Sequence, residues 1–310
     1  MHDEELDEFL AFIKTLSAYE LVERALNLML EINKVEQKNE VLKQESTQDT
    51  EELYDEYWHY IHQLQTNGTD EELEICQNLL ASSQPAKRQI VADILGSLGY
   101  QQPEKYYDYA SQQLINLLDD NDDDVVASAC HGLGHRLRKD DERAIQRLVI
   151  LAKHPKQHVR SGVNHALMGF ERDDAIDAII GLCQDESAYI RDWATFALGS
   201  QITTDNAKIR NALHQQLSDK DTNVRGEALV GLAERGDNSI EDALKHDLSL
   251  FPDTLYAIKA SGILGLSSLL PYLQKLKENY ANQLSDYDLD VIQDAIEQCS
   301  NTKIKSRDNL

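Results

Sequence analysis

The sequence contains few residues that interrupt a helix and few that carry positive charge. Only five prolines occur among 310 residues, so most of the chain can be helical. No run approaches the ~18 consecutive apolar residues that a membrane-spanning helix needs. Basic residues number 30 against 55 acidic ones, a formal net charge of −25. These shortages exclude a chain that crosses a membrane by apolar helices. They also disfavour nucleic-acid binding, because acidic surfaces repel phosphate backbones.

The few cysteines lack the spacing of a disulfide framework or a zinc site. None forms a CxxC pair, and each lies in an apolar helical stretch: Cys76, Cys130, Cys183 and Cys299. We expect four buried free thiols. Three of the first five residues are acidic, Asp3, Glu4 and Glu5, so the start of the chain is opposite in charge to a secretory or transit signal. The expected location is therefore the cytoplasm.

The negative charge is concentrated near the N-terminus. Residues 1–124 contain 28 acidic and 8 basic residues. Such a field attracts basic surfaces and speeds their association. The simpler alternative is that the charge only keeps the protein soluble.

One apolar pattern recurs six times along the chain. Its first positions are Ile90, Val125, Val159, Ile190, Val224 and Tyr256, at intervals of 35, 34, 31, 34 and 32 residues. Four residues later stand Ile94, Ala129, Val163, Ala194, Ala228 and Ala260, and eight residues later always leucine. Apolar residues at these spacings form one stripe of a helix. The alanine at the second position in four of the six repeats lets a neighbouring helix approach closely.

A second amphipathic stretch precedes most of these helices, as at residues 141–152, 173–183, 206–217 and 239–248. Polar turns carrying Asp or Ser separate the stretches and supply helix caps. Two helices in each unit of 31–35 residues cannot cover their own apolar stripe, so neighbouring units must stack. The predicted fold is all-α, an α-solenoid of about six helix pairs.

Three of the repeated helices begin with an apolar residue followed by arginine: Val159-Arg160, Ile190-Arg191 and Val224-Arg225. An arginine at this place can pair with the acidic turn of an adjacent repeat. With Asp185, Asp221 and the Ala and Leu positions, this pattern resembles the HEAT family. The form is the short bacterial one, similar to the phycobilisome-lyase-like repeats, and the resemblance covers roughly residues 85–284. It implies the fold and leaves the function open.

The chain is expected to divide into three parts. Residues 1–84 form an acidic helical cap or subdomain, residues 85–284 the HEAT-repeat solenoid, and residues 285–310 a capping helix with a polar tail. Within the first part, residues 34–50 are very polar and fit either a linker or a solvated helix.

Candidate partner-binding residues follow from the resemblance, which implies that the second helix of each pair lines the concave face. Residues pointing away from the apolar stripe there include His131, His165, Asp192, Trp193, Phe196 and Glu227. Tryptophan is frequent at interface hot spots. The alternative is that Trp193 and Phe196 pack between helices. A second acidic and aromatic stretch contributes Glu51, Glu52, Asp55 and Glu56.

No catalytic or metal-binding motif stands out. His131 and His135 have a spacing that suits two metal ligands, with His165 as a third, but no carboxylate is in step with them. GxSxG, P-loop and GxGxxG motifs are missing. We therefore predict no catalytic residues, no metal and no cofactor.

The sequence predicts a non-catalytic module that binds a basic protein. One version is an immunity or neutralising protein for a cationic toxin, and another is an assembly scaffold. The alternative is a HEAT-type enzyme, either bilin lyase-like or DNA glycosylase-like. The oligomeric state stays open.

Overall fold

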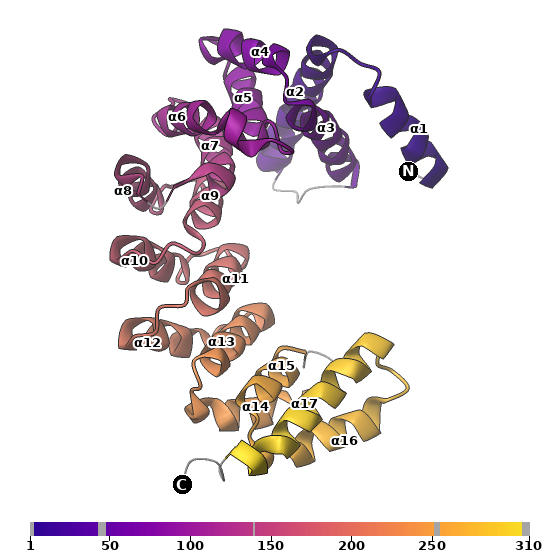
Figure 1. Ribbon diagram of the computed structural model, residues 1–310, viewed down its shortest axis with the longest axis vertical. Coiled ribbons are helices and arrows are strands. Elements are labelled where there is room, and N and C mark those ends of the chain that lie inside the picture. Colours follow the sequence, from indigo (N-terminus) through magenta and orange to yellow (C-terminus); the bar gives the residue numbers. More distant parts are fainter. Residues whose placement is uncertain (1–2, 43–47, 139, 251–254, 306–310) are drawn as a thin grey trace. The chain divides into compact units, whose positions relative to one another are not determined.

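The computed structural model describes residues 3–42, 48–138, 140–250 and 255–305. The elements in this part of the chain are helical throughout, as predicted (Figure 1). They fall into two compact units, residues 1–166 and 167–310. None of the described helices is long and apolar enough to cross a membrane.

The first unit begins with three helices that precede the repeats: α1 (Asp3–Ile13), α2 (Ala18–Leu42) and α3 (Gln48–Asn67). Helix pairs follow: α4 (Asp70–Leu80) with α5 (Pro85–Ser97), α6 (Tyr107–Leu117) with α7 (Asp123–Arg136), and α8 (Glu142–Leu151) with α9 (Gln157–Leu167). A short 3₁₀ turn, η1 (Pro103–Lys105), precedes α6. The polar stretch at residues 34–50 therefore continues α2 as far as Leu42, while residues 43–47 lie outside the described part.

The second unit continues the pairs: α10 (Asp173–Leu182) with α11 (Ala188–Phe196), α12 (Ala207–Gln216) with α13 (Thr222–Glu234), α14 (Glu241–Asp247) with α15 (Leu255–Leu264), and α16 (Leu270–Tyr280) with α17 (Asp286–Lys305). A π-helical turn, η2 (Ala197–Gln201), extends α11. Short 3₁₀ turns, η3 (Asn238–Ile240) and η4 (Ser267–Leu269), precede α14 and α16.

The repeated apolar stripe forms the core in the first five repeats, as predicted, whereas Tyr256 and Leu264 of the sixth repeat are only half-buried. In α7 the stripe residues Val125, Ala129 and Leu133 are fully buried, and the matching residues of α13 are buried in the same way. Asp122 and Asp221 cap the N-termini of these helices, because each carboxylate accepts hydrogen bonds from two backbone N–H groups. The four cysteines are free and buried, which confirms the expectation from their spacing.

Two arginines, Arg191 and Arg88, join one helix pair to the next, whereas Arg160 and Arg225 donate to backbone carbonyls of the turn before their own helix. Arg191 donates to both carboxylate oxygens of Asp219, at 2.6 and 2.9 Å, and Asp219 lies in the turn of the next pair. The predicted pairing is therefore confirmed at Arg191. Arg88 makes the equivalent bidentate contact with Asp120 in the first unit, at 2.7 Å to each oxygen.

Helix α3 packs directly on the first repeat. The Tyr57 hydroxyl donates to the buried Asp93 of α5 at 2.5 Å, and the Gln65 side chain donates to the Asp93 carbonyl at 2.8 Å. This packing supports our proposal that residues 1–84 cap the repeats. The boundaries at residues 84 and 284 stay predictions, and residues 306–310 of the predicted tail lie outside the described part.

Candidate partner-binding surfaces

An aromatic cluster lies uncovered on α11 in the second unit. Trp193 is 42% exposed and Tyr189 is 58% exposed. The Trp193 ring meets the half-buried Phe196 edge to face, with centroids 5.7 Å apart, and lies 6.3 Å from the Tyr189 ring. Trp193 therefore does not pack into the core between helices. A large aromatic surface that stays in contact with water suits an interface better than a core.

Two partly buried carboxyl groups lie on the same face. Asp192 precedes Trp193 on α11, and Glu227 projects from α13. Burial, followed by the charge of Asp221, raises the pKa of Asp192. Burial also raises the pKa of Glu227 to about 7, with the charge of Asp192 acting in the same direction and a Tyr256 hydrogen bond opposing it. Both ionised groups are thus poorly compensated in the free protein.

Few hydrogen-bond or ion-pair partners stabilise these two carboxylates. The Oδ1 atom of Asp192 is buried without a hydrogen-bond partner among the described residues. In the same part of the chain no cation forms an ion pair with Asp192 or Glu227, although Lys259 acts on Glu227 from a greater distance. Arg191 and Arg225 are engaged elsewhere, since Arg191 pairs with Asp219 and Arg225 donates to the Asp219 carbonyl at 2.8 Å.

A glycine shapes this surface. A Cβ atom at Gly226 would overlap the Tyr256 ring of α15. The missing side chain therefore lets Tyr256 approach α13 closely, where its hydroxyl donates a hydrogen bond to Glu227. We name the surface of Asp192, Trp193, Phe196, Glu227 and Tyr256 the aromatic–acidic face.

The three histidines with the spacing of metal ligands, His131, His135 and His165, lie close together in the first unit. The rings of His131 and His165 lie 5.6 Å apart, and His135 lies 5.2 Å from His165. Gly134 provides room for the His165 ring. Burial and the neighbouring histidines lower the pKa of His131 to about 4, so His131 is neutral at pH 7, and burial also lowers the pKa of His135 and of His165. Among the described residues no three His, Cys, Asp or Glu side chains are grouped to hold a metal ion.

The four predicted acids of the N-terminal stretch lie on α3 in the first unit. Glu51, Glu52 and Asp55 are exposed, and Glu56 is half-buried. Glu56 accepts a hydrogen bond from the Tyr60 hydroxyl at 3.1 Å. These acids and the aromatic–acidic face belong to different units. The binding role of each predicted residue stays a prediction.

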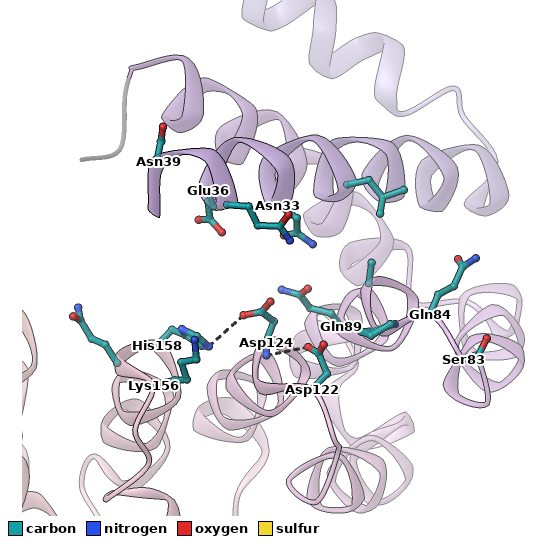
Figure 2. A pocket seen from close by; sticks show the side chains of 15 residues that line it. Asn33, Glu36, Asn39, Ser83, Gln84, Gln89, Asp122, Asp124, Lys156 and His158 are labelled. Carbon is teal, nitrogen blue, oxygen red and sulfur yellow. Dashed lines mark hydrogen bonds and ion pairs between the residues drawn. The ribbon is translucent and has the colours of Figure 1, made fainter. Parts of the chain in front are cut away.

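The structure also contains a cleft that sequence reasoning missed. It has a volume of about 990 Å³ and lies in the first unit between α2 and the N-terminal ends of α5, α7 and α9 (Figure 2). His158 meets Asp124 at 3.2 Å on its floor. The position directly before the apolar anchor supplies a lining residue in three successive repeats, as Gln89, Asp124 and His158. The repeat register could therefore have revealed part of this floor, whereas the α2 wall has no repeat signal.

Comparison with known proteins identifies the repeats. Residues 111–199 match the family of HEAT repeats. The chain is 28% identical to Protein YibA of Escherichia coli K12 over 219 residues, which is 69% of this chain and 76% of YibA. The same values hold for YibA of strain O157:H7.

Solved structures show the same fold. The crystal structure of E. coli YibA superposes with a TM-score of 0.69 at 23% identity, covering 95% of this chain and 96% of YibA. Kap121p superposes with a TM-score of 0.54 at 15% identity, covering 91% of this chain and 29% of Kap121p. With the helix pairs and the inter-repeat arginines described above, these matches identify residues 111–199 as HEAT repeats and support the predicted resemblance of the chain to bacterial HEAT-repeat proteins.

Proposed function

We propose that this chain is a non-catalytic binding module that recognises a basic protein through its aromatic–acidic face. The observation that carries the proposal is the pair of partly buried carboxyl groups with raised pKa values, Asp192 and Glu227, which have no ion-pair partner among the described residues, beside the exposed Trp193. HEAT repeats present such surfaces on a stacked scaffold of helices, and that architecture needs no chemistry of its own.

A cationic side chain from a partner would stabilise the ionised forms of Asp192 and Glu227. A Lys or Arg placed between the two carboxylates restores the favourable interactions that burial has removed. The same cation can rest against the Trp193 ring, where a cation–π contact adds ~0.5–1 kcal/mol or more. Both effects favour a basic partner over a neutral or acidic one.

The specific version of the proposal is an immunity or neutralising protein for a cationic toxin such as a nuclease. The net charge of −25 supports it, because an acidic surface can complement a phosphate-binding site and speed capture. We place this binding in the cytoplasm, a compartment in which four free cysteines stay reduced. A scaffold for a basic partner fits the same face.

The enzymatic alternatives have less support. A DNA glycosylase-like enzyme needs cations along the surface that holds the phosphate backbone. Near the aromatic–acidic face, Arg191 already forms an ion pair with Asp219. The charged groups of the face itself are carboxyl groups. Nothing in the described residues favours a tetrapyrrole site for a bilin lyase-like role.

Affinity capture from the native cytoplasm at about 0.15 M salt tests the proposal, with Trp193→Ala as the variant. Trp58→Ala is the matched control, because Trp58 is 40% exposed on α3 of the other unit. We expect one stoichiometric basic protein on the wild type and on Trp58→Ala, and its loss on Trp193→Ala. Weak retention of many cationic proteins, equal on all three baits, would show that the charge acts only non-specifically.

A further inference from the structure

The cleft of the first unit is rich in carboxamide side chains. Six line it: Asn33, Gln37, Asn39, Gln84, Gln89 and Gln157. None of these side chains makes a hydrogen bond within the described part of the chain. Their donors and acceptors are therefore available to a bound molecule. In Figure 2 Asn33 of α2 and Gln89 of α5 face each other across the cleft, and Gln84 stands at the residue directly before α5.

The walls of the cleft are held in place without a ligand. The Tyr54 hydroxyl of α3 donates to Glu36 of α2 at 2.6 Å. Helix α3 is in turn fixed to α5 by the buried contact between Tyr57 and Asp93. A site that exists before binding loses less entropy when it is filled, which increases affinity.

The charged groups of the cleft are mainly acidic. Glu36, Asp122 and Asp124 line it against a single lysine, Lys156. Asp122 is occupied as the cap of α7, whereas the carboxylate of Asp124 is exposed and pairs with His158. The electrostatic potential therefore favours a cationic ligand.

We propose that this cleft binds an extended, basic segment of a polypeptide. A carboxamide carries one donor and one acceptor group, which complement the C=O and N–H of a peptide bond. An extended segment presents both of these groups along its length, whereas a helix has already used them internally. The acidic lining supplies the preference for Lys or Arg. The inference rests on the proposed function only in taking a protein as the partner, and it concerns a different surface.

The test is selection of a displayed library of random decapeptides against the full chain. We expect enrichment of peptides that contain Lys or Arg. Their affinity should fall about tenfold on the double change Asn33→Ala and Gln89→Ala, because two hydrogen bonds are lost. The control is Gln112→Ala with Gln146→Ala, which removes two exposed carboxamides from α6 and α8 and should leave affinity unchanged.

Synthetic versions of an enriched peptide test main-chain recognition. N-methylation of alternate peptide bonds should weaken binding about tenfold, while the side chains stay the same. The inference is overturned if the library yields no binders, if binders ignore the change in the cleft, or if N-methylation has no effect.

The variant Trp193→Ala separates this inference from the proposed function. It should leave the affinity of the selected peptides unchanged, because Trp193 lies in the other unit. Protein capture that depends on Trp193, together with peptides that ignore the cleft, would refute the cleft alone. Peptides that require the cleft, together with capture that ignores Trp193, would refute the aromatic–acidic face alone.

Discussion

At the scale of single residues, Glu227 is the group whose protonation matters most for the proposed binding. Its pKa is raised to about 7, above the ordinary value for glutamate. The folded state therefore binds this proton more tightly than the unfolded state does. Stability is lost as pH rises from the unfolded pKa through about 7, where the ionised form becomes dominant.

Changing Glu227→Gln should consequently stabilise the protein at pH 8 and have little effect at pH 4.5. We expect a gain of about 1 kcal/mol or less, since the group is partly screened by solvent. Urea unfolding at the two pH values measures it, with Glu278→Gln, an exposed acid of α16, as the control. Binding of the basic partner should weaken at the same time. A loss of stability at pH 8 would contradict the origin of the shift.

Gly226 gives a second prediction at this scale. Gly226→Ala should destabilise the protein by ~1–3 kcal/mol, because the added methyl group displaces Tyr256 from a packed position. The control is Gly181→Ala in α10, where no atom lies within 4 Å of the added Cβ. That change should stabilise by up to ~1 kcal/mol through helix propensity. Thermal unfolding of both variants provides the comparison, and equal shifts would show that Tyr256 adapts without cost.

At the scale of elements, the inter-repeat arginines join one helix pair to the next. Arg191 and Asp219 are both nearly buried, with side-chain exposures of 8% and 10%. Arg191 also donates to the carbonyls of Asp185 and Glu186 in its own turn. One side chain thus fixes the turn before α11 and the turn before α13.

Arg191→Ala should therefore cost about 3 kcal/mol, because a buried carboxylate is left without its partner. Lys208→Ala is the control in the same unit, since Lys208 pairs with Asp177 at an exposed position. An exposed pair contributes ~0–1 kcal/mol. Urea titration of both variants should separate them clearly. A similar small cost for both would mean that stacking alone holds the repeats in register.

At the scale of the whole molecule, the net charge of −25 should govern how fast the proposed basic partner associates. Raising salt from about 0.05 to 0.5 M should slow association by about tenfold or more, whereas dissociation should change much less. Stopped-flow mixing with the purified partner measures the association and dissociation rates. Neutralising Glu51, Glu52, Asp55 and Glu56 together should reduce this salt dependence. Association rates that ignore salt would remove charge steering from the proposed function.

The sequence alone was sufficient for the helix pairs, the buried stripe and the inter-repeat arginine at Arg191. These features are local or repeat every 31–35 residues, so a single amino-acid sequence is enough to predict them. It also singled out Asp192, Trp193 and Glu227 by their places in the repeat, and the structure brings them to neighbouring helices of one unit.

The tertiary structure decided what the repeat could not express. A glycine follows the last leucine of the stripe in several repeats, but its role differs: Gly99 and Gly265 take positive φ values of 71° and 64° at helix ends, whereas Gly134 makes room for His165. The cleft needs α2, which carries no repeat, beside the starts of three repeated helices. Its carboxamides come from residues far apart in the chain, and the packing of α2 and α3 on α5 brings the two walls together. Periodicity reports which residues are equivalent, but contact between non-equivalent residues depends on the folded chain.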